Sequence, residues 1–94
     1  MRYNFEWDPE KAKRNIRKHK VTFERATTIF RDPNAISTFD EDHSENEERW
    51  ITIGLDGSGV LLIVSHTAKA IDQSGYQIRV ISARKATKSE AKQY

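Results

Sequence analysis

Five consecutive apolar residues, Val60–Val64, constrain the fold of this 94-residue chain more than any other feature. An uninterrupted apolar run of this length is typical of a central strand that is covered on both faces. The preceding Asp56-Gly57-Ser58-Gly59 predicts a tight hairpin turn. Before that turn, Ile51, Ile53 and Leu55 alternate with other residues, as in a strand with one buried face. The core is therefore expected around a central hairpin.

Capping signals predict two helices before this hairpin and one at the end of the chain. Asp8-Pro9 opens a helix over 9–20, because aspartate accepts backbone N–H bonds at the N-cap and proline suits the first helical position. Thr22 caps a second helix at about 23–31, and the capping box from Thr87 to Glu90 opens a short terminal helix. Strands are predicted over 3–7, 35–39, 50–55, 60–67 and 76–83, with a looser connection over 68–75.

This order, β-α-α-β-β-β-β-α, predicts an α+β fold with an antiparallel sheet of about four to five strands. Strands joined by short turns are expected to pair as neighbours. The length predicts a single domain over 1–94 and leaves no room for a barrel enzyme or a full dinucleotide-binding fold.

Several chemistries are excluded or disfavoured by composition. The chain has no cysteine, so neither a disulfide framework nor a thiolate nucleophile is available. Its three histidines are far apart in the sequence and predict no metal site, and no phosphate-binding glycine loop is present, so we expect no cofactor. No apolar run approaches the roughly 20 residues of a membrane span, and no signal segment is recognisable, so we expect a cytoplasmic protein without a membrane partner.

Charge is strongly segregated along the chain. Residues 40–48 hold 6 of the 14 acids and no lysine or arginine, which leaves 16 bases against 8 acids, a net charge of +8, elsewhere. A basic surface of this kind favours an anionic partner such as nucleic acid, although an ordinary soluble surface gives the same count. The acidic segment has three interpretations: a solubilising loop, a guard against nonspecific RNA binding, or a contact for a basic partner segment.

His66 is the first candidate for proton transfer, a role that Lys69 or Tyr76 could share, with base and acid not assigned separately. It follows the apolar run at the end of a central strand, where rigid scaffolds often present functional groups. Its ordinary pKa of about 6.5 suits proton transfer near neutrality. By alternation it shares a face with Val60, Leu62 and Val64, so burial at the core rim is the alternative.

Arg79 and Arg84 are the candidates for phosphate binding. Arg79 lies inside an apolar strand, where an arginine either faces solvent, meets an anion or pairs with an acid such as Glu48. In a straight strand the side chains of Arg79 and Arg84 point to opposite faces, and only a bulge or the turn after Ala83 brings both to one rim of the sheet. Arg49, Lys69 and Lys85 are further candidate phosphate contacts.

Three ordered blocks of sequence also carry a family resemblance. The first runs from Phe5-Glu6-Trp7-Asp8-Pro9 to Phe30-Arg31-Asp32-Pro33, the second from Asp42-His43-Ser44-Glu45 to Ile53-Gly54, and the third from Ile78 to Thr87. Together they resemble the BrnT-type toxins of bacterial type II toxin–antitoxin pairs, over essentially the whole chain. In this chain Ala68-Lys69 replaces the charged pair that often follows Thr67 in that family, and the terminal helix is short.

The resemblance implies a RelE-like ribonuclease fold and inhibition of translation by RNA cleavage. It also implies a cognate antitoxin with a ribbon-helix-helix domain, through which alone the toxin would contact operator DNA. The catalytic residues would be His66, Arg79 and Arg84, and the RNA-binding residues Arg49, Lys69 and Lys85. The reaction expected of such a site is metal-independent attack of a ribose 2′-hydroxyl on the adjacent phosphate. The rival hypothesis is a non-catalytic basic module that captures a protein or an RNA.

Overall fold

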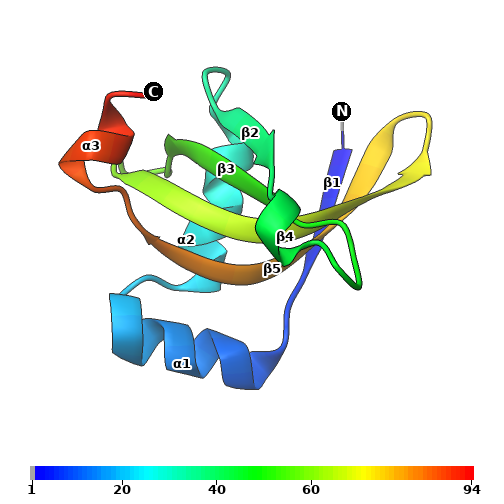
Figure 1. Cartoon of the computed structure of the whole chain (residues 1–94), viewed down its shortest axis with the longest axis horizontal. Helices are drawn as coiled ribbons and strands as arrows, with labels where there is room; N and C mark the ends of the chain where they lie inside the picture. The colour runs from blue at the N-terminus through cyan, green and yellow to red at the C-terminus, as the bar shows by residue number, and fades with distance from the viewer. Residues whose placement is uncertain (1) are drawn as a thin grey trace.

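A five-stranded sheet in the order β1-β5-β4-β3-β2 forms the centre of the molecule (Figure 1). This computed structural model describes residues 2–94. The α+β class and the element order agree with the sequence prediction, and β2 to β5 pair as antiparallel neighbours. β1 joins β5 in parallel, so the sheet is mixed. The strands are β1 (Arg2–Glu6), β2 (Ile36–Phe39), β3 (Trp50–Leu55), β4 (Leu61–Asp72) and β5 (Gly75–Lys85).

The helical segments follow the predicted caps. They are α1 (Pro9–His19), α2 (Phe23–Thr27), η1 (Thr28–Arg31), η2 (Glu41–His43) and α3 (Lys88–Ala91). The predicted second helix divides into α2 and the 3-10 segment η1. The hydroxyls of Thr27 and Thr28 donate to the carbonyl oxygens of Glu24 and Arg25 at 2.7 Å each, which offers the backbone an alternative to regular helix.

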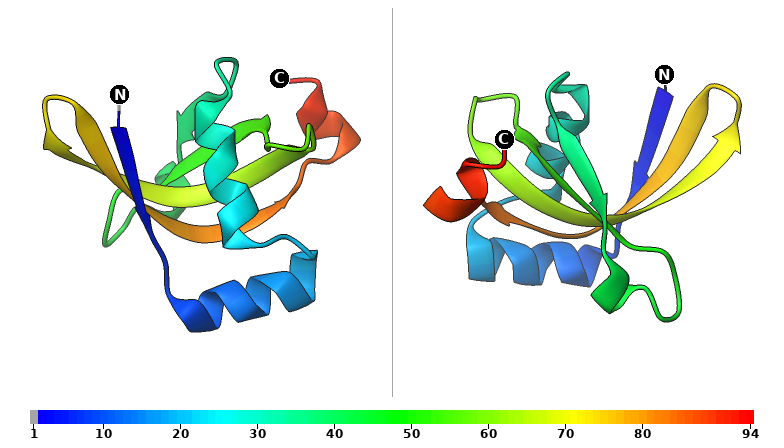
Figure 2. Two further views of the ribbon diagram at one scale, coloured as in Figure 1. Left: turned by 180° about the vertical axis from the view of Figure 1, so that it is seen from behind. Right: turned by 45° about the horizontal axis from the view of Figure 1, so that its top comes forward.

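The two faces of the sheet have different neighbours. α2 crosses one face and lies in front of the sheet in the left view of Figure 2, seen from behind. This helix face carries the main core, in which Phe23, Ile29, Leu62, Val64 and Val80 are almost fully buried. We name the opposite side, turned away from α1 and α2, the open face; by register it carries Ile63, Ser65, Thr67, Arg79 and Arg84.

The connection predicted over 68–75 is wrong, because the chain stays in the sheet there. β4 continues to Asp72 and β5 begins at Gly75, which forms a long hairpin. Asp72 Oδ1 accepts hydrogen bonds from the backbone N–H and the hydroxyl of Ser74, both at 2.8 Å, and closes the turn. β1 pairs with this distal part of β5, from Arg2 opposite Gly75 to Glu6 opposite Arg79, and so adds a third strand beside the β4–β5 hairpin.

Where β1 ends, the buried side chain of Asn15 takes over the hydrogen bonding along the edge of β5. Within residues 2–94, no strand pairs with the outer edge of β5 beyond Arg79, and Asn15 of α1 lies against that edge. The Asn15 amide accepts from Ala83 N at 3.0 Å and donates to Ala83 O at 2.8 Å and Val21 O at 2.9 Å. One side chain thus satisfies three buried backbone groups and fixes α1 to the sheet.

Candidate active site

A β-bulge brings the two candidate arginines to one face. Ser65 is opposite Ser82, but His66 is opposite Val80, so Ile81 is the extra residue in β5. This insertion reverses the parity of the residues beyond it. Arg79, opposite Thr67, and Arg84, opposite Ile63, therefore both lie on the open face. The bulge was one of the two routes left open by the sequence.

Arg79 shares a carboxylate with a second arginine. Its Nη2 donates to Glu47 Oε2, and Arg49 Nε donates to Glu47 Oε1 at 3.2 Å. All three side chains are about one third exposed. The acid that pairs with Arg79 is thus Glu47 and not the neighbouring Glu48. Arg49 and Arg79, two of the predicted site residues, meet at the open face through this contact.

Arg84 is held at the other end of the open face. Its two terminal nitrogens donate to the two oxygens of Glu90, both at 2.7 Å, in a bidentate pair. These hydrogen bonds, with one from the backbone of Thr87, lower the pKa of Glu90 to about 2. Arg84 therefore belongs to a different ion pair from Arg79.

His66 lies on the helix face, away from the arginines. Its exposed fraction is 3%, and its ring forms a T-shaped pair with that of Phe30 at a centroid distance of 4.9 Å. Nδ1 lies 3.0 Å from the carbonyl oxygen of Thr67, which can only accept, so Nδ1 carries the proton. Nε2 then accepts from the Thr52 hydroxyl at 2.6 Å, and that oxygen accepts from Ser37 at 2.7 Å. Burial lowers the pKa of His66, so the ring is neutral near pH 7.

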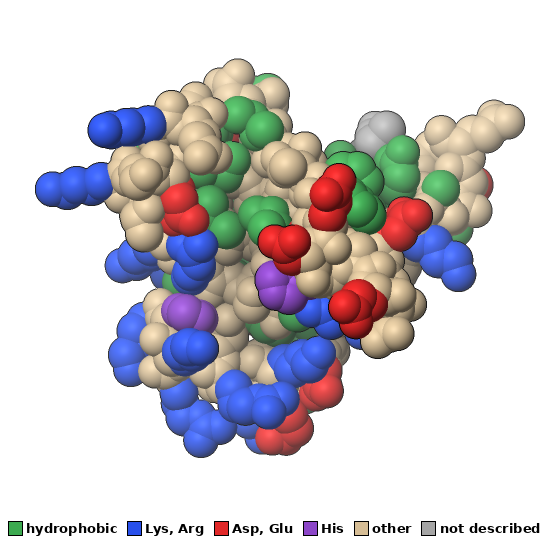
Figure 3. Space-filling model, viewed as in Figure 1, with side chains coloured by type: hydrophobic (Ala, Val, Ile, Leu, Met, Phe, Trp, Pro, Cys, Tyr) green, Lys and Arg blue, Asp and Glu red, His purple; other side chains and the backbone are tan. Residues whose placement is uncertain are grey.

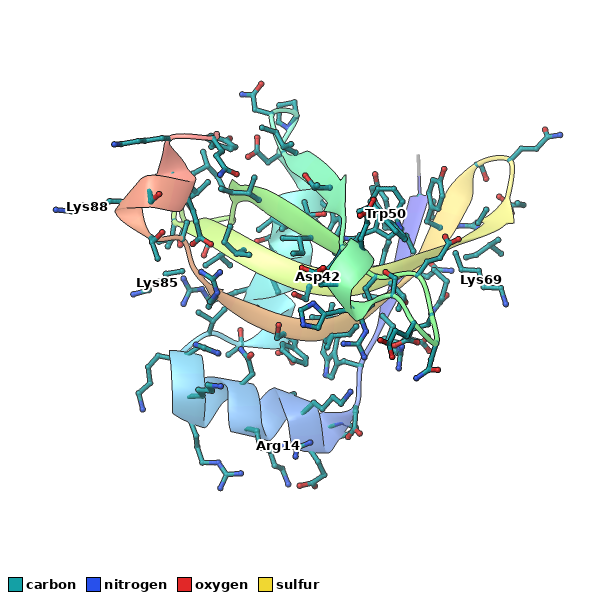
Figure 4. All side chains as sticks on the ribbon, viewed as in Figure 1. Arg14, Asp42, Trp50, Lys69, Lys85 and Lys88 are labelled. Atoms are coloured by element: carbon teal, nitrogen blue, oxygen red, sulfur yellow. The ribbon has the colours of Figure 1, made fainter. Side chains whose placement is uncertain are left out.

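The two candidate lysines are far from each other. Lys69, near the distal end of the β4–β5 hairpin, and Lys85, beside α3, lie at opposite ends of the sheet (Figure 4). Both are exposed. In Figure 3 the acidic side chains gather between the cations at these two ends and those of α1. The predicted residues therefore do not form one compact site.

Sequence reasoning missed a histidine beside the arginine pair. His43 lines a hollow of about 480 Å³ with Arg49 and Glu47. Its Nδ1 lies 2.9 Å from Asp40 Oδ2 and 3.1 Å from Oδ1, and its side chain is 66% exposed. The sequence signal for it is the spacing of Asp40 and His43, three residues apart in a turn.

Within residues 2–94, no group of three or more histidine, aspartate or glutamate side chains has the arrangement of a metal site. The same residues contain no helix that is long and apolar enough to cross a membrane.

The fold is shared with a small toxin whose crystal structure is known. The crystal structure of the Brucella abortus ribonuclease toxin BrnT matches with a TM-score of 0.61, over 94% of this chain and 100% of that one, at 19% identity. The family model described as "Ribonuclease toxin, BrnT, of type II toxin-antitoxin system" matches residues 7–90. The chain belongs to the BrnT family of ribonuclease toxins. No curated protein sequence matches it closely enough to add a relative.

Proposed function

We propose that this chain cleaves single-stranded RNA without a metal ion. In this reaction a ribose 2′-hydroxyl attacks the adjacent phosphorus, and the products are a 2′,3′-cyclic phosphate and a 5′-hydroxyl. The protein must orient the nucleotide and stabilise charge on the phosphoryl oxygens. The observation that carries the proposal is the pair formed by Arg49 and Arg79 around one carboxylate beside an open hollow.

The two strand arginines act on different phosphates. Arg79 and Arg84 are opposite Thr67 and Ile63, four positions apart in β4, which corresponds to about 13 Å along a strand. Their side chains also point to different acids, Glu47 and Glu90. We assign the scissile phosphate to Arg79 with Arg49, and a phosphate further along the same RNA strand to Arg84. Lys69 extends this cationic path at one end, whereas Lys85, opposite Leu62, has the parity of the helix face and would contact RNA only at the rim of the sheet.

His66 has a positioning role in this proposal. Both ring nitrogens are occupied, and the ring is buried on the other face of the sheet. It joins β4 to β3 through Thr52 and supports the strands that carry the arginines. Replacement by asparagine tests this: a positioning residue lowers the melting temperature together with activity, whereas a catalytic one abolishes cleavage in a protein of normal stability.

The biological proposal follows the family. RNA cleavage would inhibit translation in the cytoplasm, and a cognate antitoxin with a ribbon-helix-helix domain would neutralise the toxin by covering its basic face. Operator DNA would be contacted only through that antitoxin. Exposed apolar side chains support such a partner, because Ile16 on α1 and Ile36 on β2 are 43% and 42% exposed.

Purified protein tests the activity. In EDTA, the wild-type chain is expected to cleave single-stranded RNA, and Arg79→Ala to lose at least about 2 kcal/mol of transition-state stabilisation, roughly thirtyfold in rate. Arg14→Ala is the matched control, because Arg14 is an exposed arginine of α1. An Arg79→Ala protein with full activity would remove Arg79 from the mechanism. RNA binding without cleavage by the wild type would favour the rival capture module.

A further inference from the structure

We propose that Glu47 is the general base and His43 the general acid of the cleavage reaction. Both side chains line the same hollow beside the open face, together with Arg49. This inference rests on the proposed ribonuclease function and identifies its proton-transfer groups. It assigns proton transfer to two groups that solvent reaches, instead of to His66, whose two ring nitrogens both have hydrogen-bond partners.

Glu47 is held where a base for the 2′-hydroxyl is needed. Its contacts use only Nη2 of Arg79 and Nε of Arg49. Among residues 2–94, the other guanidinium nitrogens of these two arginines have no side-chain partner, so they are available to phosphate oxygens. A phosphate bound there lies directly beside the Glu47 carboxylate. The 2′-oxygen is on the carbon adjacent to the one that carries this phosphate, and so it comes within reach of the same carboxylate.

His43 is oriented by an acid, as a proton-transferring histidine requires. The Asp40 carboxylate can only accept, so Nδ1 of His43 carries the proton in their contact at 2.9 Å. The second nitrogen, Nε2, is left for the substrate. The Asp40 side chain is 13% exposed and the His43 side chain 66%. The ring is therefore held at Nδ1, and the side chain lines the hollow.

The loop that carries both groups is internally braced. Asp40 N donates to Arg49 O at 2.9 Å, which closes the neck of the loop. Inside it, the Ser44 hydroxyl donates to Asp40 O and accepts from Arg49 N at 3.0 Å. These bonds give His43 and Glu47 a defined spacing. The loop is thus more than a solvated acidic segment.

The proposed step transfers two protons and exchanges one bond at phosphorus. Glu47 takes the proton of the 2′-hydroxyl as the 2′-oxygen forms its bond to phosphorus. The bond from phosphorus to the 5′-oxygen breaks, and that oxygen receives the Nε2 proton of the His43 imidazolium. Arg79 and Arg49 stabilise the negative charge on the phosphoryl oxygens. No co-reactant is consumed, and the products are the cyclic phosphate and the 5′-hydroxyl.

A guard role for Glu47 predicts the opposite result. A carboxylate that only neutralises Arg79 in the free protein competes with the phosphate, so its removal would accelerate cleavage. A catalytic base gives slower cleavage when its charge is removed, although the RNA binds equally well or more tightly. The sign of the rate change therefore distinguishes the two.

The test compares Glu47→Gln and His43→Ala with the matched controls Glu48→Gln and His19→Ala. Glu48 is the exposed neighbour of Glu47, and His19 lies at the end of α1. Single-turnover cleavage of a fluorescent single-stranded RNA is measured in EDTA. Binding is measured with the same oligonucleotide carrying 2′-deoxyribose, which lacks the nucleophile, and melting temperature confirms folding.

We expect each test variant to lose about 100-fold or more in rate, within the range typical of general acid–base catalysis. Binding of the deoxy oligonucleotide should stay within threefold of wild type or tighten, and both controls should cleave normally. Cleavage by Glu47→Gln at or above the wild-type rate, or by His43→Ala at that rate, overturns the role of that residue and leaves the ribonuclease proposal intact. A wild-type protein that cleaves no RNA overturns both.

Discussion

Replacing Asn15 with alanine should destabilise the protein by about 3 kcal/mol. The substitution leaves the N–H and C=O of Ala83 and the C=O of Val21 without their partner. Each buried group that loses its hydrogen bond costs about 1–3 kcal/mol, and water entering the space left by the amide reduces the sum. For a domain of this size, 3 kcal/mol corresponds to a fall in melting temperature of about 12–24 °C.

Urea denaturation followed by tryptophan fluorescence measures this loss. Asn4→Ala is the control, because Asn4 is exposed on β1, and its free energy of unfolding should change by less than about 0.5 kcal/mol. A loss below about 1 kcal/mol for Asn15→Ala would refute the view that this amide takes the place of β1 along the outer edge of β5.

Three further perturbations test other contacts. Burial lowers the pKa of His66, so below pH 6.5 the unfolded chain binds a proton that the native chain does not. The free energy of unfolding should therefore fall as the pH is lowered below 6.5. A His66→Asn protein that shows the same fall would mean that another group causes it. Arg84→Ala should weaken RNA binding and reduce the slope of log affinity against log salt by about 1, and an unchanged slope would exclude a phosphate contact. The cognate antitoxin should raise the free energy of unfolding of the toxin by about 2.7 kcal/mol when the free antitoxin concentration is a hundred times Kd, and it should abolish cleavage. A complex that keeps full cleavage activity would contradict this prediction.

Much of the fold follows from local signals. The caps at Asp8, Thr22 and Thr87 each accept the expected backbone hydrogen bond, and the hairpin turn after Leu55 lies where its glycines predict it. These features depend on neighbours within a few residues. The parallel pairing of β1 with β5 depends on residues more than 70 positions apart, and no local pattern specifies it. The extended hairpin over 68–75 likewise depends on this distant pairing, so the local sequence predicts only a loose connection there.

For the candidate site too, the sequence predicts the residue types but not their placement in space. Residue type predicts Arg79, Arg84 and Arg49 as anion-binding groups, but their spatial relation depends on the bulge at Ile81 and on the fold of loop 40–49. His66 had the right chemistry, and its side of the sheet followed from alternation. Whether that side was buried or open was set by α2 and η1, which no periodicity in β4 reveals. The acidic neighbours of His43 favour a solvated loop, so the sequence alone does not single it out.

The chemical identity of the RNA ends tests the central claim most directly. Fragments produced by the purified wild-type protein in EDTA are analysed for their terminal groups, with the Arg79→Ala protein prepared in parallel. Attack by the 2′-hydroxyl predicts a 2′,3′-cyclic phosphate on one fragment and a 5′-hydroxyl on the other, and a strongly reduced yield of both from the variant. Fragments with 5′-phosphate and 3′-hydroxyl ends, or equal yields from the two proteins, would contradict the proposed mechanism.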